Sequence, residues 1–305
     1  MNTDQLKSLF DNITVWKRRG QRAPHKPLLI LYALACCIHH KKRYIPYAEV
    51  DDKLKQLLVD FGPTRKSYHP EYPFWRLQND GIWELKNSEQ IERPVGNTDV
   101  KRNVLLKYDV AGGFKDDIFN TLAADPEITA DIAMQILEAN FPHSIHNDIL
   151  QAVGLDFECD RIKKRKRDPD FRERILNAYQ YQCAVCGFNV RVGHTLVGLE
   201  AAHIKWHQAG GPDTEENGIA LCALHHKLFD RGAFTVSEDM TVQVSDRAHG
   251  TIGFQEWLLD YHGKSLKRPQ RPVFYPEPEF VNWHVREVFQ GESRYPCESV
   301  PESGF

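Results

Sequence analysis

The sequence has no uninterrupted run of about 18 apolar residues, the length that a transmembrane helix needs. Its longest apolar stretch, residues 28–38 (LLILYALACCI), is better interpreted as a buried helix. The first residues, MNTDQLKSLFDN, are polar and do not form a secretory signal peptide. We therefore expect a cytoplasmic protein with no membrane partner. Its seven cysteines should then stay reduced, so a C-x2-C pair favours a metal site over a disulfide.

The sequence also has little net charge, −3, so overall charge does not indicate a nucleic-acid partner. It has no internal repeat and no low-complexity tract. Its basic residues are nevertheless unevenly distributed. Residues 161–167 (RIKKRKR) include six basic residues in seven, and residues 16–19 (WKRR) form a second basic stretch. Such runs are usually solvated surface, but beside a nuclease centre they would contact phosphates.

At 305 residues the chain is long enough for about two domains of ordinary size. Hydrophobic periodicity predicts a mainly helical first domain, residues 1–155, with a small sheet. Its expected helices cover residues 1–20, 28–40, 47–61, 103–108, 116–123, 128–140 and 145–153. Strands at 74–78 and 82–85 are expected to form a hairpin around Asn79-Asp80-Gly81. A basic linker, 156–170, leads to a second domain, 171–260, and to a C-terminal extension, 261–305.

The second domain begins with cysteines at metal-site spacing. Cys183-x2-Cys186 is followed by Cys222-x2-His225, and two such pairs match a closed tetrahedral Cys3His zinc site. Four protein ligands leave no position for water, so this Zn2+ should be structural and should supply folding energy. The alternative is a chance arrangement of buried cysteines.

A second series, His203, Asn217 and His226, is interleaved with these ligands. Residues 196–204 predict a strand that ends at His203, and residues 206–216 predict a loop. Asn217 opens the return, and a helix should begin at about Cys222. With C-x2-C, A-H-I, an Asn and C-x2-H-H in this order, residues 171–235 resemble the HNH endonucleases, whose fold is the ββα-metal hairpin.

The resemblance implies a role for each residue of the series. His203 would be the general base that activates water, a task that suits an imidazole. Asn217 would orient His203 by hydrogen bonding. His226 would bind a single catalytic divalent ion, Mg2+ or Mn2+, which polarises the scissile phosphate.

The chain departs from the HNH pattern at one position. Many members place Asp or His directly before the general base as a metal ligand, whereas this chain has Ala202. Asp230, one helical turn after His226, can face the same ion. Asp230, Glu200 or water must therefore supply the second ligand.

The first domain carries a second resemblance. Residues 13–40, 72–77 (YPFWRL) and 80–83 (DGIW) resemble the sulfur-binding domain of restriction endonucleases specific for phosphorothioate-modified DNA. A non-bridging sulfur is larger and less hydrated than oxygen, so it loses less hydration against apolar atoms such as the rings of Tyr72 and Pro73. The alternative for these two residues is a loop that caps the core. The implied DNA- and sulfur-binding residues are His25, Lys26, Tyr72, Pro73, Arg76 and Arg102.

Together these expectations describe an α+β protein with a mainly helical recognition domain and a zinc-containing ββα-metal domain. It would be a modification-dependent restriction endonuclease that binds phosphorothioated double-stranded DNA and hydrolyses phosphodiester bonds nearby. Each chain has one HNH centre and two strands must be cut, so we expect a homodimer. Two alternatives are an HNH endonuclease directed to methylated or unmodified DNA, and a non-enzymatic zinc DNA-binding protein.

Overall fold

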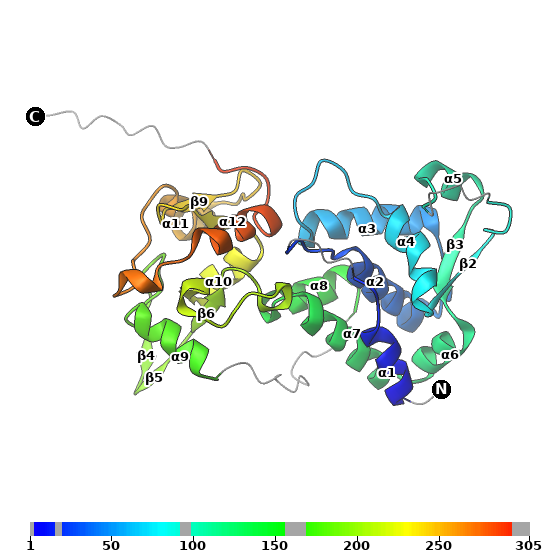
Figure 1. Cartoon of the computed structure of the whole chain (residues 1–305), viewed down its shortest axis with the longest axis horizontal. Coiled ribbons are helices and arrows are strands. Elements are labelled where there is room, and N and C mark those ends of the chain that lie inside the picture. Colours follow the sequence, from blue (N-terminus) through cyan, green and yellow to red (C-terminus); the bar gives the residue numbers. More distant parts are fainter. Residues whose placement is uncertain (1–2, 16–19, 92–98, 156–168, 295–305) are drawn as a thin grey trace, which may run out of the picture. The chain divides into compact units, whose positions relative to one another are not determined.

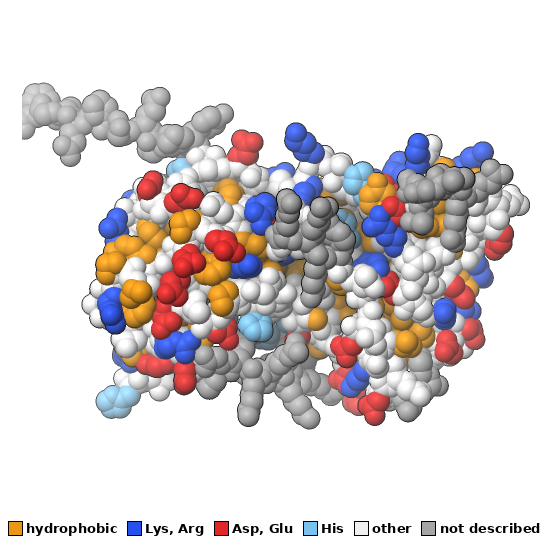
Figure 2. All heavy atoms as spheres, in the orientation of Figure 1, with side chains coloured by type: hydrophobic (Ala, Val, Ile, Leu, Met, Phe, Trp, Pro, Cys, Tyr) orange, Lys and Arg blue, Asp and Glu red, His pale blue; other side chains and the backbone are white. Residues whose placement is uncertain are grey.

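The structure is a computed structural model that describes residues 3–15, 20–91, 99–155 and 169–294 (Figure 1). The two basic runs at 16–19 and 161–167 lie outside the described residues. The chain divides into two compact units, residues 1–162 and 163–305. Figure 2 shows Lys and Arg side chains interspersed with Asp and Glu on the visible face, as the small net charge suggests. None of the helices in the described residues is long and apolar enough to cross a membrane.

The N-terminal unit is built around one buried helix, α2 (His25–His40). Consecutive residues Leu28 to Leu31 are all buried, which is the pattern of a helix covered on every side. It packs against α3 (Tyr47–Phe61), α6 (Asp116–Ala124), α7 (Pro126–Asn140) and α8 (His146–Val153). The predicted buried helix at 28–40 is thus confirmed. The first helix, α1 (Thr3–Asp11), is shorter than the predicted 1–20.

A three-stranded antiparallel sheet completes this unit, in the order β1 (Tyr44–Pro46), β3 (Ala111–Phe114), β2 (Trp83–Lys86). Its middle strand must approach its neighbours closely. A Cβ on Gly113 would lie 1.8 Å from the Arg43 carbonyl oxygen, so no larger residue fits there. A short helix, α5 (Arg102–Lys107), precedes β3.

The predicted strand at 74–78 is wrong. This segment forms helix α4 (Glu71–Arg76) and a 3-10 turn (Leu77–Asp80), and β2 pairs with β3 instead. Pro73 lies in the first turn of α4, where a missing backbone N–H costs little. Phe74, Trp75 and Leu77 all turn into the core, which a helical period allows and strand alternation does not. Gly81, with φ of 80°, ends the 3-10 turn rather than a hairpin.

The C-terminal unit contains the ββα arrangement that the sequence predicts. Strands β6 (Leu199–His203) and β7 (Gly218–Cys222) pair antiparallel, with His203 opposite Gly218, and β7 runs directly into α10 (Ala223–Asp230). Both α10 and α9 (Pro169–Ala178) contact the two strands. The remaining elements of this unit are β4 (Arg191–Val192), β5 (Thr195–Leu196), β8 (Phe234–Val236), β9 (Val242–Val244), α11 (Ile252–Trp257) and α12 (Pro278–Glu287), with 3-10 turns at His207–Ala209, Glu215–Asn217, Leu259–Tyr261 and Pro272–Phe274. In the N-terminal unit, a further 3-10 turn at His143–Ile145 precedes α8.

The described part of the expected C-terminal extension is integral to this unit. Phe280 and Val281 of α12 belong to the same buried core as Phe171 of α9. The ring of His284 stacks on Phe229 of α10, with centroids 3.7 Å apart, and its Nδ1 hydrogen-bonds Thr235 Oγ1 of β8. Helix α12 therefore packs against α10 and β8 and should stabilise them.

We predict that Trp283→Ala, at a residue 2% exposed on α12, destabilises the C-terminal unit by about 3–5 kcal/mol through the cavity it leaves. The matched control is Val285→Ala on the same helix, 42% exposed, which should change stability by less than about 0.5 kcal/mol. Chemical denaturation followed by circular dichroism measures both. Equal stability of the two variants would contradict a buttressing role for α12.

Candidate active site

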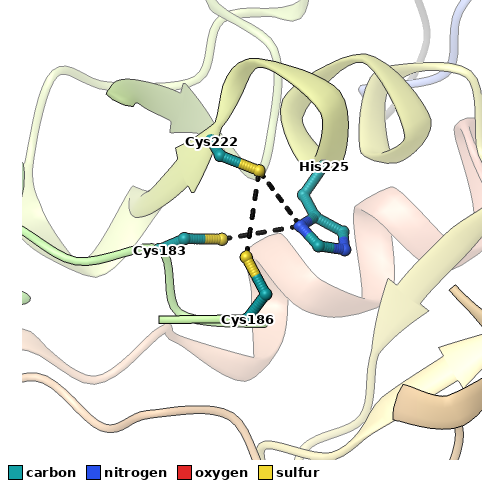
Figure 3. A group of neighbouring side chains, drawn as sticks. All are labelled: Cys183, Cys186, Cys222 and His225. Atoms are coloured by element: carbon teal, nitrogen blue, oxygen red, sulfur yellow. Dashed lines mark hydrogen bonds between the residues drawn. The ribbon is translucent and has the colours of Figure 1, made fainter. Parts of the chain in front are cut away.

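The two cysteine pairs converge on one point (Figure 3). The ligand atoms of Cys183, Cys186, Cys222 and His225 all lie within 4.8 Å of one another. Three separations are 3.6 Å (Cys183 Sγ to His225 Nδ1), 4.0 Å (Cys186 Sγ to Cys222 Sγ) and 3.1 Å (Cys222 Sγ to His225 Nδ1). A tetrahedral zinc site with ordinary bond lengths has ligand separations of about 3.5–3.8 Å. The cluster therefore fits a structural Zn2+.

The surrounding backbone prepares this cluster. Ala184 N–H donates to the Ala220 carbonyl at 2.8 Å, which ties the first cysteine pair to β7. The other ring nitrogen of His225, Nε2, donates to the Trp257 carbonyl at 2.9 Å, so Nδ1 is left as the metal-binding nitrogen. Hydrogen bonds from the neighbouring thiols lower the pKa of Cys183, the direction that favours a thiolate ligand.

His226, the next residue, belongs to a second group. Its Nδ1 lies 2.6 Å from Glu200 Oε2 on β6, and its Nε2 lies 3.1 Å from Asp230 Oδ2 one helical turn away. Burial by itself would lower the pKa of His226, but the two carboxylates raise it to about 9. The two carboxylates thus hold the ring from opposite edges.

This geometry distinguishes the two candidate second ligands. Cis ligands of an octahedral ion with bonds of 2.0–2.1 Å lie about 3.0 Å apart, which matches His226 Nε2 and Asp230 Oδ2. Glu200 contacts the opposite nitrogen, where it fixes the ring orientation. Trp206 Nε1–H donates to Asp230 Oδ1 at 3.0 Å, which turns Oδ2 toward His226. Of the two carboxylates, Asp230 is therefore the one that could share an ion with His226 Nε2.

The position before the general base explains why Glu200 reaches His226. Side chains alternate along a strand, so Ala202 and Glu200 lie on the same face of β6. Glu200 meets α10 on that face, and Ala202 is fully buried. Ala202 offers no ligand atom, and the carboxylate two residues earlier contacts the histidine instead.

His203 lies on the other face of β6, against α9. Its ring stacks on Phe171 with centroids 4.2 Å apart and an interplanar angle of 13°. Its Nε2 is 2.7 Å from Asp213 Oδ1 in the loop between the strands. Gly218, opposite His203, leaves space for α9, because a Cβ there would lie 2.1 Å from Ile175 Cδ1.

Asn217 is fully buried and braces the loop rather than hydrogen-bonding the His203 ring. Its side-chain oxygen accepts from Lys205 N–H at 2.8 Å, and its amide nitrogen donates to the carbonyls of Lys205 (3.0 Å) and Pro212 (2.9 Å). The direct hydrogen bond expected between Asn217 and His203 is thus replaced by backbone contacts on both sides of the loop. Asn217 could therefore orient His203 only indirectly, by holding the loop in place.

In the N-terminal unit, Tyr72 has the exposure that a binding residue needs. Its side chain is 37% exposed, and its ring contacts two neighbours. His69 stacks on one side at 4.9 Å, and the Arg76 guanidinium lies 5.1 Å from the ring centroid. Pro73 is buried in the first turn of α4, so it does not share the exposure of Tyr72.

The expected basic residues differ in how accessible their charge is. Lys26 forms an ion pair with Asp80 and donates to the Thr14 carbonyl at 2.9 Å, and its side chain is 14% exposed. Arg76 pairs with Asp99, and Arg102 pairs with Asp51 at 2.7 Å, but these two guanidinium side chains are about half exposed.

His25 is uncharged at neutral pH. Burial lowers the pKa of His25 to about 4, with smaller Coulombic contributions from Arg65 and His69 in the same direction. It therefore offers a neutral imidazole at pH 7, and any contact it makes with DNA would be a hydrogen bond rather than an ion pair.

The sequence reasoning missed three contacts: Asp213 to His203, Trp206 to Asp230, and His69 to Tyr72. The first two partners come from the loop after β6, at spacings that belong to no metal or nuclease motif. The Gly210-Gly211-Pro212 turn directly before Asp213 is the one sequence signal for them, because it folds the loop back on the strand.

We predict that Cys222→Ser reduces bound zinc from about one ion per chain to nearly none and unfolds the C-terminal unit, because the metal supplies much of its folding energy. Metal analysis and circular dichroism measure this. Cys37→Ala, at a buried cysteine of α2, should keep its zinc. A Cys222→Ser protein with full zinc content and unchanged melting would contradict the site.

Comparison with known families accounts for both units. Residues 3–158 match the ScoMcrA-like DNA sulfur-binding domain, and residues 183–237 match an HNH endonuclease family. The HNH match contains the zinc ligands, His203, Asn217, His226 and Asp230. A search of curated proteins found no match.

Solved structures with similarity include fragments of ScoMcrA. Its sulfur-binding domain complexed with phosphorothioated DNA is 22% identical, over 49% of this chain and 94% of that chain, with a TM-score of 0.43. Its sulfur-binding and SRA domains complexed with phosphorothioated DNA are 21% identical, over 65% and 68%, with a TM-score of 0.45. The match to the phosphorothioation-dependent restriction endonuclease ScoMcrA is 22% identical and covers 49% of this chain and 27% of that enzyme, with a TM-score of 0.40. The match to the ScoMcrA-like DNA sulfur-binding domain, residues 3–158, covers more than half of this chain. The chain therefore belongs to that family, and an HNH endonuclease domain follows the sulfur-binding domain.

Proposed function

We propose that this protein is a modification-dependent restriction endonuclease that binds phosphorothioated double-stranded DNA and cleaves phosphodiester bonds nearby. The observation that carries the proposal is the presence, on one chain, of the sulfur-binding family match and an HNH domain with its histidines in place. A sulfur-binding domain without a nuclease would read the mark and leave the DNA intact. An HNH domain without a reader would cut with little choice of target.

In the proposed reaction His203 takes a proton from the water that attacks the scissile phosphorus. Phe171 stacks on the face of the His203 ring, and Asp213 contacts its Nε2, so both residues restrict the orientation of the ring. His226 and Asp230 would hold the catalytic Mg2+ or Mn2+, oriented by Glu200 and Trp206. When bound, the ion polarises the phosphate and stabilises the leaving 3′ oxygen.

Target choice would come from the N-terminal unit. The exposed ring of Tyr72 offers an apolar surface with the cation of Arg76 beside it. A phosphate oxygen that met this ring would lose hydration without regaining hydrogen bonds, whereas a sulfur loses less. Arg76 and Arg102 are about half exposed, so they are the better candidates to bind the neighbouring phosphates. His25 and Lys26 are less accessible and would support the binding surface rather than carry its charge.

We further propose that the protein acts as a homodimer in the cytoplasm. Each chain has one HNH centre, so cutting both strands at one site calls for two chains. A reducing compartment would keep the three cysteine ligands of the Cys3His cluster available to zinc.

We predict that the protein, supplied with Mn2+, cleaves a duplex containing a phosphorothioate linkage and spares the matched unmodified duplex. Gel electrophoresis of the products measures both. Equal cleavage of the two duplexes would remove the sulfur specificity and favour the unmodified-DNA nuclease. Binding of both duplexes without cleavage by any divalent ion would favour a zinc DNA-binding protein. His203→Ala is the control for the nuclease centre, because it should bind the modified duplex normally and cleave it at least about 100-fold more slowly.

We predict that Tyr72→Ala lowers the binding preference for phosphorothioated over unmodified duplex by about tenfold or more, because the substitution removes the apolar ring that the sulfur would contact. Titrations with the two labelled duplexes give the ratio. Val59→Ala, a comparably exposed apolar side chain on α3 (42%), should leave the ratio unchanged. Both variants should retain zinc, and a Tyr72→Ala protein with the original ratio would remove Tyr72 from the pocket.

A further inference from the structure

We infer that Asp213 is the positioning residue of the general base, selecting the tautomer and orientation in which His203 accepts a proton. The inference rests on the proposed role of His203. It starts from one short contact, 2.7 Å between Asp213 Oδ1 and His203 Nε2. A carboxylate can only accept at that distance, so the imidazole proton lies on Nε2. The basic lone pair of the neutral ring is then on Nδ1, which becomes the nitrogen that takes the proton from water.

The loop that carries Asp213 is closed by backbone contacts. The Asn217 amide joins the start of the loop, Lys205, to Pro212, directly before Asp213. Gly211 allows the approach, because a Cβ there would lie 1.8 Å from the Lys205 carbonyl oxygen. The Asp213 carbonyl accepts from Arg174 on α9 at 2.7 Å. The backbone from Gly211 to Asp213 is therefore held by contacts with Lys205, Asn217 and Arg174, and these contacts position the Asp213 carboxylate.

This arrangement gives Asn217 an indirect function. Its side chain contacts backbone groups of the loop, and the loop delivers Asp213 to His203. The Asn of the His–Asn–His series would thus act on the general base through a carboxylate that the motif does not contain. Phe171 fixes the plane of the ring and Asp213 fixes its rotation within that plane.

The charge of Asp213 should also influence His203. The charged and titratable groups near the contact are Arg174 from α9, His207 with its ring 6.1 Å from that of His203, and Glu215, which pairs with Arg174 at 3.2 Å. Asp213, at hydrogen-bond distance, is the carboxylate closest to the ring among these groups. A negative charge interacts more favourably with an imidazolium than with a neutral imidazole, and Asp213→Asn removes that charge.

The test is Asp213→Asn, assayed on the phosphorothioated duplex with Mn2+ across pH. The plateau cleavage rate should fall about 10- to 100-fold, because the amide no longer enforces one tautomer. The acid limb of the pH–rate profile should move to lower pH by about one unit, because imidazolium loses its partner. Asp213→Glu should recover part of the rate. Duplex affinity, zinc content and melting temperature should stay at wild-type values.

Glu215→Gln is the matched control, since it removes a carboxylate from the same loop whose partner is Arg174 rather than His203. It should keep the wild-type acid limb. An Asp213→Asn protein with wild-type rate and pH profile, or one that matches Glu215→Gln, would overturn the inference. Failure of wild-type protein to cleave would instead overturn the proposed function.

A measurement on wild-type protein keeps the inference testable if Asp213→Asn does not fold. Nitrogen-15 NMR of labelled histidines reports the tautomer, and the His203 signals are identified by their loss in His203→Gln. The Nε2–H tautomer is expected at alkaline pH. The Nδ1–H tautomer would overturn the inference.

Discussion

The C-terminal unit is organised around the Cys3His cluster. It joins a knuckle of the chain at Cys183 and Cys186 to the junction of β7 and α10 at Cys222 and His225. The β6–β7 hairpin is two strands of five residues each, too small a sheet to be stable alone. Zinc bound by this cluster would compensate for that small size, together with the packing of α9 and α12.

Adjacent histidines on α10 consequently serve two different sites. His225 points to the zinc cluster and is fixed by the Trp257 carbonyl, whereas His226 points to Glu200 on β6 and to Asp230. Successive residues on a helix are about 100° apart, so one rigid helix presents neighbouring imidazoles in different directions. Ordering of α10 by zinc would therefore also order the proposed catalytic ion site, without any direct contact between the two sets of ligands.

The N-terminal unit organises its charges in another way. Its candidate cations are each held by a carboxylate: Lys26 by Asp80, Arg76 by Asp99 and Arg102 by Asp51. Pre-formed pairs restrict the long side chains before any ligand arrives. A DNA phosphate that contacted Arg76 or Arg102 would have to share or displace a carboxylate. Under the proposed function, such competition would make DNA binding depend more strongly on the contact with the ring of Tyr72.

The sequence by itself determined the buried helix at 28–40, the Cys3His cluster and the ββα order of the C-terminal unit. Each of these follows from local spacing: apolar periodicity, C-x2-C pairs, or a His and an Asn at the ends of a hairpin. The tertiary structure decided what spacing does not encode. The predicted strand at 74–78 forms part of α4 and a 3-10 turn instead, because core packing buries Phe74, Trp75 and Leu77 together. Asp213 and Trp206 reach their partners from the folded loop after β6, and Glu200 reaches from β6 to His226 on α10. These contacts join residues that are separated in the chain, so local spacing does not report them. Burial near Arg65 and His69, which no local pattern reports, left His25 neutral.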